Sequence, residues 1–488
     1  MTTRRDFLKS VGVAAPAIIL PRTGLTGMGG GGRMGGGGAG GGLDVPVFEQ
    51  PLYIPPVLQP VESTATRDTY ALTQENATVE IVPGTQTAIL GYNGMTPGPT
   101  MVVDADREVA MRHTNNSNVR TTTHLHGGHM RAGDDGHPVD YVNPGDTREY
   151  VYSNKQLPAT LWYHDHTMDF TGDQVYAGLA GFYLISDDYE RSLGLPAGDQ
   201  EIAIVIQDRT FASDGSLVYS DNIMGELGDT ILVNGVPYPY FEVSTRKYRV
   251  RILNGSNARS YNLVLSNGAS FVQIGSDGGL LPAPVVRSSL SIAPAERLDV
   301  IIDFSNAPVG SQIVLQNTAG SGSTAQIMRF DVATAADDGS VIPEVLRPIE
   351  RLDPAAAVQT RRWVFGMAGG PMPWVINGLP YDEHRVDAYP RLGTTEIWEL
   401  VNRTGMMHPV HIHDIMWQIL DINGRPPAAH DAGWKDTFQV PPMATVRVIG
   451  RFDDYVGDPN DITTAYMMHC HILEHEDHAM MTQFIVVE

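Results

Sequence analysis

The sequence predicts an all-β protein built from three consecutive domains. Short apolar runs separated by Pro, Gly and Asn turns recur from about residue 45 to the C-terminus. A chain of 488 residues is too long for one hydrophobic core, and this length indicates about three domains. We therefore expect domains at residues 45–188, 189–345 and 346–488, preceded by an N-terminal segment of residues 1–44.

The N-terminal segment resembles an export signal joined to a linker. Arg4 and Arg5 precede a short apolar run at residues 11–20, which is the pattern of a twin-arginine signal. This run is too short to span a bilayer as a permanent helix. Residues 24–42 are almost entirely glycine, a composition typical of a flexible linker. We expect export by the twin-arginine pathway to the periplasm or cell exterior, without stable membrane insertion.

The first domain, residues 45–188, is expected to carry two pairs of histidines at one edge of a β-sandwich. Strands are predicted at residues 78–82 and 179–185. His124 and His126 form one pair, and His164 and His166 form the other. In a strand, a His-x-His spacing places both imidazoles on the same face. Each pair lies where a predicted strand gives way to a loop.

The second domain, residues 189–345, repeats the strand-and-turn pattern but contains no histidine. We expect a second sandwich without metal ligands, which sets the geometry of its neighbours. A Pro- and Ala-rich stretch at residues 343–358 reads as a linker to the next domain. The clearest strands of the second domain are predicted at residues 202–207, 248–253, 261–265 and 300–304.

The third domain, residues 346–488, contains the single cysteine of the chain. Strands are predicted at residues 395–401 and 445–449. Ten of the sixteen histidines of the protein lie in four tight clusters, two in the first domain and two in the third. The third domain contributes His408, His411 and His413, then His469, His471 and His475, with Met480 close behind.

Cys470 lies between His469 and His471, and this arrangement predicts two metal sites. In extended backbone, Cys470 points to one face while the two flanking histidines point to the other. A thiolate, imidazole and a distant methionine thioether, here Met480, form the ligand set of an electron-transfer copper site. The two histidines on the opposite face then require a second metal site. Zinc fits poorly, since structural zinc sites usually take several cysteines and gain nothing from a methionine.

The net charge and the cysteine count exclude some classes of partner and of structure. The formal net charge of −23 argues against binding to nucleic acid or to anionic membrane surfaces. A single cysteine excludes an intramolecular disulfide and leaves the thiol free for a metal.

These motifs resemble those of the multicopper oxidase family, and they occur in that family's order across residues 45–488. The resemblance implies three consecutive cupredoxin-like Greek-key β-barrel or sandwich domains that hold four copper ions: one type 1, one type 2 and two type 3. It implies a trinuclear cluster between the first and third domains, each of which would supply four histidines. The implied ligands are His408, Cys470, His475 and Met480 for type 1 copper; His124 and His411 for type 2 copper; and His126, His164 and His471, and His166, His413 and His469, for the two type 3 coppers.

Two carboxylates are candidate catalytic groups. The resemblance implies that Asp135 and Glu476 guide protons to the trinuclear site. Reduction of dioxygen to two water molecules consumes four protons, which side-chain acids must relay. We expect the electron donor to be oxidised one electron at a time near His475, the type 1 ligand expected closest to the surface.

The electron donor is less closely defined by the sequence. Residues 393–398 and 471–477 resemble bacterial spore-coat laccases, which oxidise phenols and aromatic amines. Residues 425–437 and 465–469 resemble periplasmic cuprous oxidases, in which methionines bind substrate Cu(I). In this chain, Met367 and Met406 would take that role. Thr404 stands where that subfamily has aspartate, and its long Met- and His-rich insert is absent between residues 367 and 408.

We therefore predict a laccase-like oxidase whose partners are dioxygen and phenolic or aromatic amine donors, acting as a monomer. The alternative is a cuprous oxidase that oxidises Cu(I) to Cu(II) in periplasmic copper homeostasis and tolerance. A non-catalytic cupredoxin protein or copper store is a third hypothesis. Non-catalytic members of the family have lost ligands, whereas this chain has lost none, and a store would not consume oxygen catalytically.

Overall fold

The computed structural model describes residue 43, residues 45–370 and residues 372–488. The predicted export signal and the glycine-rich linker therefore lie outside the described residues. Within the described ranges, no helix is both long and apolar enough to cross a membrane.

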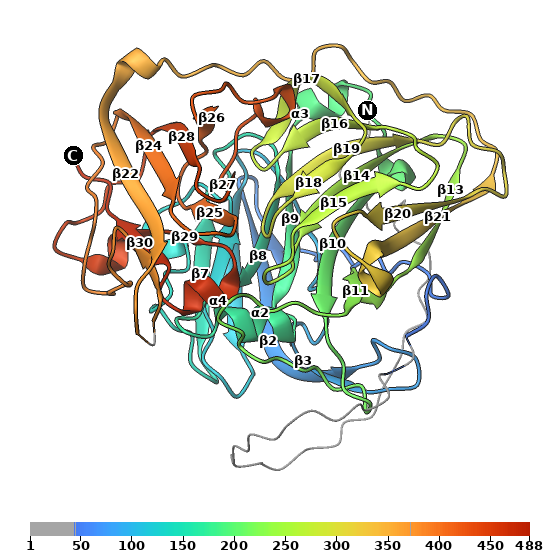
Figure 1. Cartoon of the computed structure of the whole chain (residues 1–488), viewed down its shortest axis with the longest axis horizontal. Helices are drawn as coiled ribbons and strands as arrows, with labels where there is room; N and C mark the ends of the chain where they lie inside the picture. The colour runs from blue at the N-terminus through green and yellow to red at the C-terminus, as the bar shows by residue number, and fades with distance from the viewer. Residues whose placement is uncertain (1–42, 44, 371) are drawn as a thin grey trace.

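Strands dominate the described chain, and they form two sheets in each of three successive stretches. In Figure 1 the orange and red strands of the C-terminal stretch lie on the left, and the green and yellow strands of the middle stretch lie on the right. The sheets group as the sequence predicts, although the boundaries at residues 188 and 345 remain a prediction.

The first stretch forms one sheet in the order β1-β2-β5-β7, with β3 paired to β2, and a second sheet in the order β4-β9-β8-β6. The second sheet carries the histidine pairs of this stretch. The elements of the first stretch are β1 Glu62–Ser63, β2 Arg67–Val79, β3 Thr87–Tyr92, β4 Met101–Asp104, β5 Glu108–Asn115, β6 Thr123–His126, 3-10 helix η1 Ala132–Asp134, β7 Thr147–Tyr152, β8 Thr160–Asp165, α2 Thr171–Ala177, β9 Ala180–Ser186 and α3 Asp188–Ser192.

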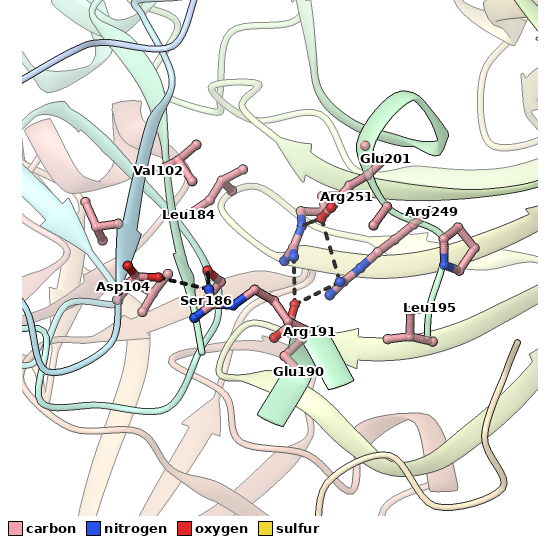
Figure 2. Close-up of a pocket in the computed structure, with 15 residues that line it drawn as sticks. Val102, Asp104, Leu184, Ser186, Glu190, Arg191, Leu195, Glu201, Arg249 and Arg251 are labelled. Carbon is pink, nitrogen blue, oxygen red and sulfur yellow. Dashed lines mark hydrogen bonds and ion pairs between the residues drawn. The ribbon is translucent and has the colours of Figure 1, made fainter. Parts of the chain in front are cut away.

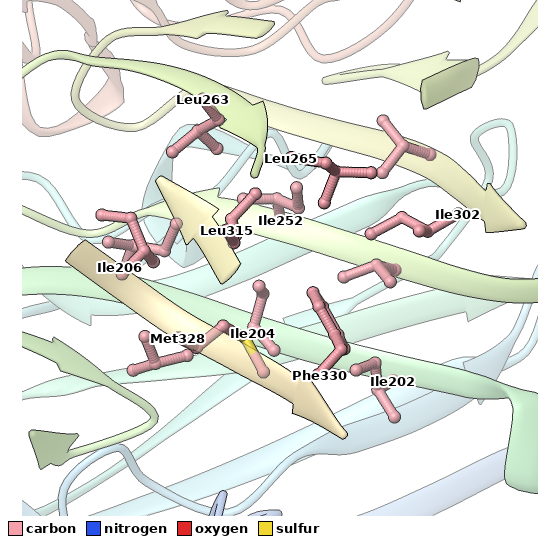
Figure 3. Packing of buried hydrophobic residues seen from close by; sticks show 14 of the residues in the cluster. Ile202, Ile204, Ile206, Ile252, Leu263, Leu265, Ile302, Leu315, Met328 and Phe330 are labelled. Atoms are coloured by element: carbon pink, nitrogen blue, oxygen red, sulfur yellow. The ribbon is translucent and has the colours of Figure 1, made fainter. Parts of the chain in front are cut away.

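The second stretch forms a seven-stranded sheet, β12-β11-β10-β14-β19-β16-β17, and a five-stranded sheet, β13-β21-β20-β15-β18. Ile202, Ile204 and Ile206 alternate along β10 and pack into the core between the two sheets (Figure 3). The elements are 3-10 helix η2 Gly198–Gln200, β10 Glu201–Arg209, β11 Thr230–Val233, β12 Val236–Pro237, β13 Tyr240–Ser244, β14 Lys247–Asn254, β15 Tyr261–Leu265, β16 Phe271–Ser276, β17 Gly279–Arg287, β18 Leu290–Ile292, β19 Arg297–Asp303, β20 Gln312–Asn317, η3 Gly322–Ala325 and β21 Gln326–Thr334.

The third stretch forms a five-stranded sheet, β23-β22-β24-β28-β26, and a four-stranded sheet, β27-β25-β29-β30. The four-stranded sheet carries the remaining histidine motifs and Cys470. The elements are 3-10 helix η4 Pro354–Ala356, β22 Ala357–Met367, β23 Trp374–Ile376, β24 Thr395–Asn402, β25 His408–Ile412, β26 Gln418–Ile422, η5 Ala429–Asp431, β27 Thr437–Val440, β28 Thr445–Arg451, η6 Ile462–Thr464, β29 Tyr466–Cys470, α4 Leu473–Asp477 and β30 Met481–Phe484.

One arrangement of strands is repeated in all three stretches. Each has a parallel pair, β2 with β5, β10 with β14 and β22 with β24. The second strand of each pair is then joined by an antiparallel neighbour, β7, β19 and β28 respectively. The repetition indicates three copies of one β-sandwich plan.

The expected strands differ from the observed ones at one place. Residues 78–82 were expected to be a strand, but β2 ends at Val79 and the chain then turns. The β2 strand lies almost wholly before that segment, in a stretch rich in polar residues. Here pairing with β3 and β5, rather than local apolarity, defines the strand.

Candidate metal centre

The histidines lie on neighbouring strands of the two four-stranded sheets. His124 on β6 is directly opposite His164 on β8, and His411 on β25 is directly opposite His469 on β29. The two sheets thus present matching pairs of imidazoles from the first and third stretches.

Eight buried histidines converge where these stretches meet. The Nε2 atoms of His124 and His411 are 3.4 Å apart, although the residues are 287 positions apart in sequence. His413 and His469 approach to 3.3 Å through their Nε2 atoms. The members of this group, here called the eight-histidine cluster, are His124, His126, His164, His166, His411, His413, His469 and His471.

Backbone carbonyls fix the outward nitrogen of three of these rings. The Nδ1 atoms of His124 and His411 lie 2.7 and 2.9 Å from the carbonyl oxygens of Asp135 and Asp436. The Nδ1 of His164 lies 2.8 Å from the carbonyl oxygen of Asp165. Because a carbonyl accepts, each Nδ1 carries the proton, which leaves Nε2 free for a metal.

Carboxylates hold the outward nitrogens of three further rings. The Nδ1 of His413 lies 2.7 Å from Oδ2 of Asp135. Glu476 lies between two rings, with Oε1 3.1 Å from Nδ1 of His166 and Oε2 2.9 Å from Nδ1 of His469. Both predicted acids therefore contact candidate ligands directly, as carboxylates that orient imidazoles commonly do at metal sites.

His126 is oriented in the opposite sense. Its Nε2, rather than Nδ1, is held, 3.0 Å from Oδ1 of Asp436. Its Nδ1 is buried without a hydrogen-bond partner. His471 is different again, because neither of its ring nitrogens has a hydrogen-bond partner among the described residues.

The cluster has the properties of a metal site. The inward nitrogens of His126, His164, His166 and His471 are buried and unpartnered, which is costly unless a further group binds them. Burial is the main cause that lowers the pKa of His126, His164 and His471 well below the usual value, which favours the neutral imidazole that metals bind. The residues therefore fit bound metal ions.

A second buried group contains Cys470. Its Sγ lies 3.3 Å from Nδ1 of His408 and 3.5 Å from Nδ1 of His475, and the two Nδ1 atoms are 3.3 Å apart. Burial raises the pKa of the Cys470 thiol. A thiolate at this position therefore requires a nearby positive charge, which a metal ion supplies.

Met480 is buried in the same apolar core as Cys470, as the expected axial position requires. Its backbone carbonyl accepts a hydrogen bond from the Cys470 amide, and its amide donates to the carbonyl of His475. The sequence-predicted residues therefore assemble into two groups, which the covalent neighbours of Cys470 connect.

Exposure does not single out His475 as the ligand closest to the surface, contrary to what the sequence led us to expect. His408 and His475 are both fully buried. The indole of Trp374 stacks on His475 at a centroid distance of 3.8 Å and is fixed by a 2.8 Å hydrogen bond from Nε1 to the carbonyl of Ile223. Although the segment before His408 is short, the group around Cys470 is covered, because β23 and the loop around residue 223 lie over it.

Thr404, noted in the sequence as a departure from the cuprous oxidase pattern, contacts a candidate ligand. Its Oγ1 lies 2.7 Å from Nε2 of His408, so it holds the ring with Nδ1 directed at Cys470. The two methionines considered for Cu(I) differ: Met367 is 54% exposed, whereas Met406 is half-buried against the core around Cys470.

Sequence reasoning missed Asp436, Arg297 and Trp374. Asp436 and Arg297 form a fully buried ion pair beside His126, joined across 139 positions of sequence. A histidine spacing reveals ligands, but no local pattern reveals a partner that reaches the site from another domain.

Comparison with known proteins identifies the family. Models described as multicopper oxidase match residues 73–190, 206–336 and 351–488. The chain is similar to a laccase of Bacillus stratosphericus, at 37% identity over 90% of this chain and 99% of that protein. It is also similar to a bilirubin oxidase of Albifimbria verrucaria, at 36% identity over 90% of this chain and 81% of that protein.

Solved structures give the same result. A laccase from Pediococcus acidilactici has a TM-score of 0.84 at 33% identity and covers 91% of this chain and 95% of its own. The McoA multicopper oxidase from Aquifex aeolicus has a TM-score of 0.82 at 35% identity, over 91% of this chain and all of its own. The three β-sandwiches are thus cupredoxin-like domains, and the chain belongs to the multicopper oxidase family, which binds copper and uses oxygen as electron acceptor.

Proposed function

We propose that this protein is a laccase-like oxidase that binds four copper ions and couples oxidation of phenolic or aromatic amine donors to reduction of dioxygen to water. The observation that carries the proposal is the pair of buried groups, one around Cys470 and one of eight histidines, with unpartnered nitrogens directed inward. Both groups are complete, which argues against a non-catalytic binding protein.

In this proposal, each of the four copper ions is assigned its own ligands. His408, Cys470 and His475, with Met480, hold a type 1 ion; His124 and His411 hold a type 2 ion; and the remaining histidines of the eight-histidine cluster hold a type 3 pair. Three of the latter, His166, His413 and His469, already place their ligand atoms within 4.8 Å of one another. Bound copper supplies one-electron redox chemistry and the reduction of dioxygen.

The protein residues contribute orientation, exclusion of water and proton movement. Thr404 fixes His408, and Trp374 shields His475 from solvent. Four protons must reach the cluster for each dioxygen reduced. Oδ1 of Asp135 is buried without a hydrogen-bond partner, and both carboxylate oxygens of Glu476 face imidazoles alone, so each can accept a proton and release it.

The covering of the proposed type 1 group determines where a donor makes contact. Because Trp374 lies over His475, an organic donor contacts the surface around Trp374 rather than the imidazole itself. Oxidation of Cu(I) is the second candidate function. Its support is the exposed Met367, which pairs across the β22–β23 ladder with Trp374.

The remaining elements of the proposal concern cell biology and assembly. Arg4 and Arg5 ahead of the apolar run at residues 11–20 support export by the twin-arginine pathway, to the periplasm or cell exterior. This location suits a role in copper homeostasis if Cu(I) is a physiological substrate. We propose that the protein acts as a monomer.

Oxygen uptake by the copper-loaded protein tests the function. It is measured with a methoxyphenol and with Cu(I), each with and without a Cu(I) chelator. Rapid phenol oxidation that is indifferent to added copper supports the laccase function; slow phenol oxidation with rapid Cu(I) oxidation supports the second function. Cys470→Ser should abolish oxygen uptake and the blue absorption while the protein stays folded, and retained activity in that variant contradicts both.

A further inference from the structure

Two aspartates hold the eight-histidine cluster in a mirrored arrangement. Asp135, from the first domain, accepts from His124 of its own domain through its carbonyl and from His413 of the third domain through its carboxylate. The carboxylate therefore crosses the interface between domains, while the carbonyl stays within its own.

Asp436, from the third domain, reproduces this pattern. Its carbonyl accepts from Nδ1 of His411 in its own domain, and its carboxylate accepts from His126 in the first. The difference lies in the ring it holds, because His126 offers Nε2 to the carboxylate and leaves Nδ1 inward. In a neutral imidazole, the nitrogen that donates a proton cannot also bind a metal, so the position of Asp436 selects Nδ1 of His126 as the inward atom.

Arg297 fixes the position of Asp436. This arginine begins β19 in the second domain, which supplies no histidine, and its side chain is completely buried. Nη1 donates to Oδ1 of Asp436 at 2.8 Å and Nη2 donates to Oδ2, a two-point contact that sets the plane of the carboxylate. The guanidinium is itself anchored, since Nε donates to the carbonyl of Thr160 and Nη1 to that of Ala295, both at 2.9 Å.

The second domain also holds the two residues that precede Asp436. The ammonium of Lys435 lies 2.8 Å from Asp277 and 3.0 Å from Glu296. The amide of Gly278 donates to the carbonyl of Trp434 at 2.9 Å. A Cβ at Gly278 would lie 2.5 Å from Cβ of Trp434, so this close approach requires glycine. Lys435 and Asp436, which are adjacent and of opposite charge, are thus each bound by side chains of the second domain.

We propose that Arg297 is a positioning residue of the metal centre, which holds Asp436 so that His126 presents Nδ1 to a copper ion. The second domain thereby shapes the trinuclear site without supplying a ligand. The inference rests on the proposed function, because it assumes that the eight-histidine cluster binds copper. It differs from a merely structural role, in which Arg297 would join domains and leave the ring of His126 unaffected.

Arg249 provides a matched control. It is another buried arginine of the second domain, and Figure 2 shows it beside Glu190 at a cavity of about 100 Å³. Nη1 of Arg249 lies 2.8 Å from Oε1 of Glu190, and Nε lies 3.0 Å from Oδ1 of Asp299. Among the described residues, these contacts include no histidine, so loss of this arginine removes a buried ion pair without touching the cluster.

The test reads the tautomer of His126 directly in the copper-free protein. Long-range ¹⁵N–¹H spectra of protein labelled at histidine distinguish a proton on Nε2 from one on Nδ1, and His126→Gln identifies the signal. The wild type and Arg249→Gln should show His126 protonated at Nε2 alone. Arg297→Gln should show a mixture of tautomers, together with copper affinity at the cluster reduced by about 10- to 100-fold.

Arg297→Lys decides the question should Arg297→Gln fail to fold. It keeps the positive charge but loses the two-point contact, and a mixture of tautomers in this variant supports the inference. A wild type with His126 protonated at Nδ1, or an Arg297 variant with the wild-type tautomer and copper affinity, overturns it. A wild type that binds no copper would instead contradict the proposed function, and the copper-free spectra keep these two failures distinct.

Discussion

The first and third domains hold the eight-histidine cluster in the same way but balance its charges differently. Asp135 and Asp436 each join their own domain's histidine by a carbonyl and the other domain's histidine by a carboxylate. Among the described residues, the Asp135 carboxylate forms ion-pair contacts with imidazoles alone. The Asp436 carboxylate is paired with the buried Arg297.

This difference indicates two separate tasks. Burial, the largest influence, acts to raise the pKa of Asp135, but His413 and His124 outweigh it and lower that pKa. Because its contacts are with imidazoles, which can themselves release a proton, protonation of Asp135 would leave no permanent cation without a partner. For Asp436, protonation would leave a buried guanidinium without its partner, so that side is fixed. One half of the interface is suited to proton movement and the other to rigid orientation.

The largest expected effect is the loss of the arginine on the fixed side. Arg297→Met leaves the Asp436 carboxylate buried without its cation, and this should lower the free energy of unfolding by about 3–5 kcal/mol. Asp135→Asn removes no ion pair with a permanent cation and should cost about 1–3 kcal/mol. Denaturant unfolding of the two copper-free variants measures both, and equal losses would contradict the distinction.

Copper binding should respond on the Asp135 side as well. Asp135→Asn weakens the hydrogen bond that orients His413, and a change of this kind lowers metal affinity by about 10- to 100-fold. Competition with a copper chelator measures the affinity. Glu149→Gln is the control, because Glu149 pairs with Arg112, both side chains are exposed, and the change should leave copper affinity unchanged.

Crowding around the ion pair should add to the cost of an unfavourable backbone conformation. Gly127 has φ +83°, and a Cβ there would lie 2.6 Å from Oδ2 of Asp436 and 2.7 Å from Nη2 of Arg297. Gly127→Ala should lower the free energy of unfolding by more than the roughly 1–3 kcal/mol that unfavourable backbone conformation costs. Gly145, with φ +88° and open space around it, is the matched control for the backbone cost alone. The same loss in both variants would show that the ion pair is not tightly enclosed.

The smallest effect is expected just outside the Asp135 side. Arg131, which directly precedes η1, is largely exposed, and its Nη2 lies 3.3 Å from Oδ2 of Asp134 at the end of η1. Arg131→Ala should change the free energy of unfolding by less than about 1 kcal/mol, because exposed ion pairs contribute little. Thermal unfolding of this variant and the wild type checks the value, and a loss comparable to that of Arg297→Met would contradict the charge comparison.

Much of the metal centre was predictable from the sequence because its residues sit at short strand spacings. His124 and His126 on β6, and His469 and His471 on either side of Cys470 at the end of β29, belong to the eight-histidine cluster, whereas Cys470 belongs to the other group, as alternation predicts. What could not be predicted depends on contacts between domains. Nothing near Arg297 marks it as a partner of Asp436, and nothing in the short segment before His408 reveals that Trp374 covers His475.

The fold was predictable in class but not in every strand. Strands with a regular apolar pattern, such as residues 261–265, match the structure, whereas β2 depends on pairing with β3 and β5 that its polar sequence does not indicate.

The number of donor molecules oxidised for each dioxygen consumed tests the central claim most directly. With copper-loaded protein and a one-electron phenolic donor, the account predicts a ratio of about four and no hydrogen peroxide, because a complete cluster reduces dioxygen to water. A ratio of about two with accumulation of hydrogen peroxide would contradict it, since two-electron chemistry does not require the eight histidines that the first and third domains bring together.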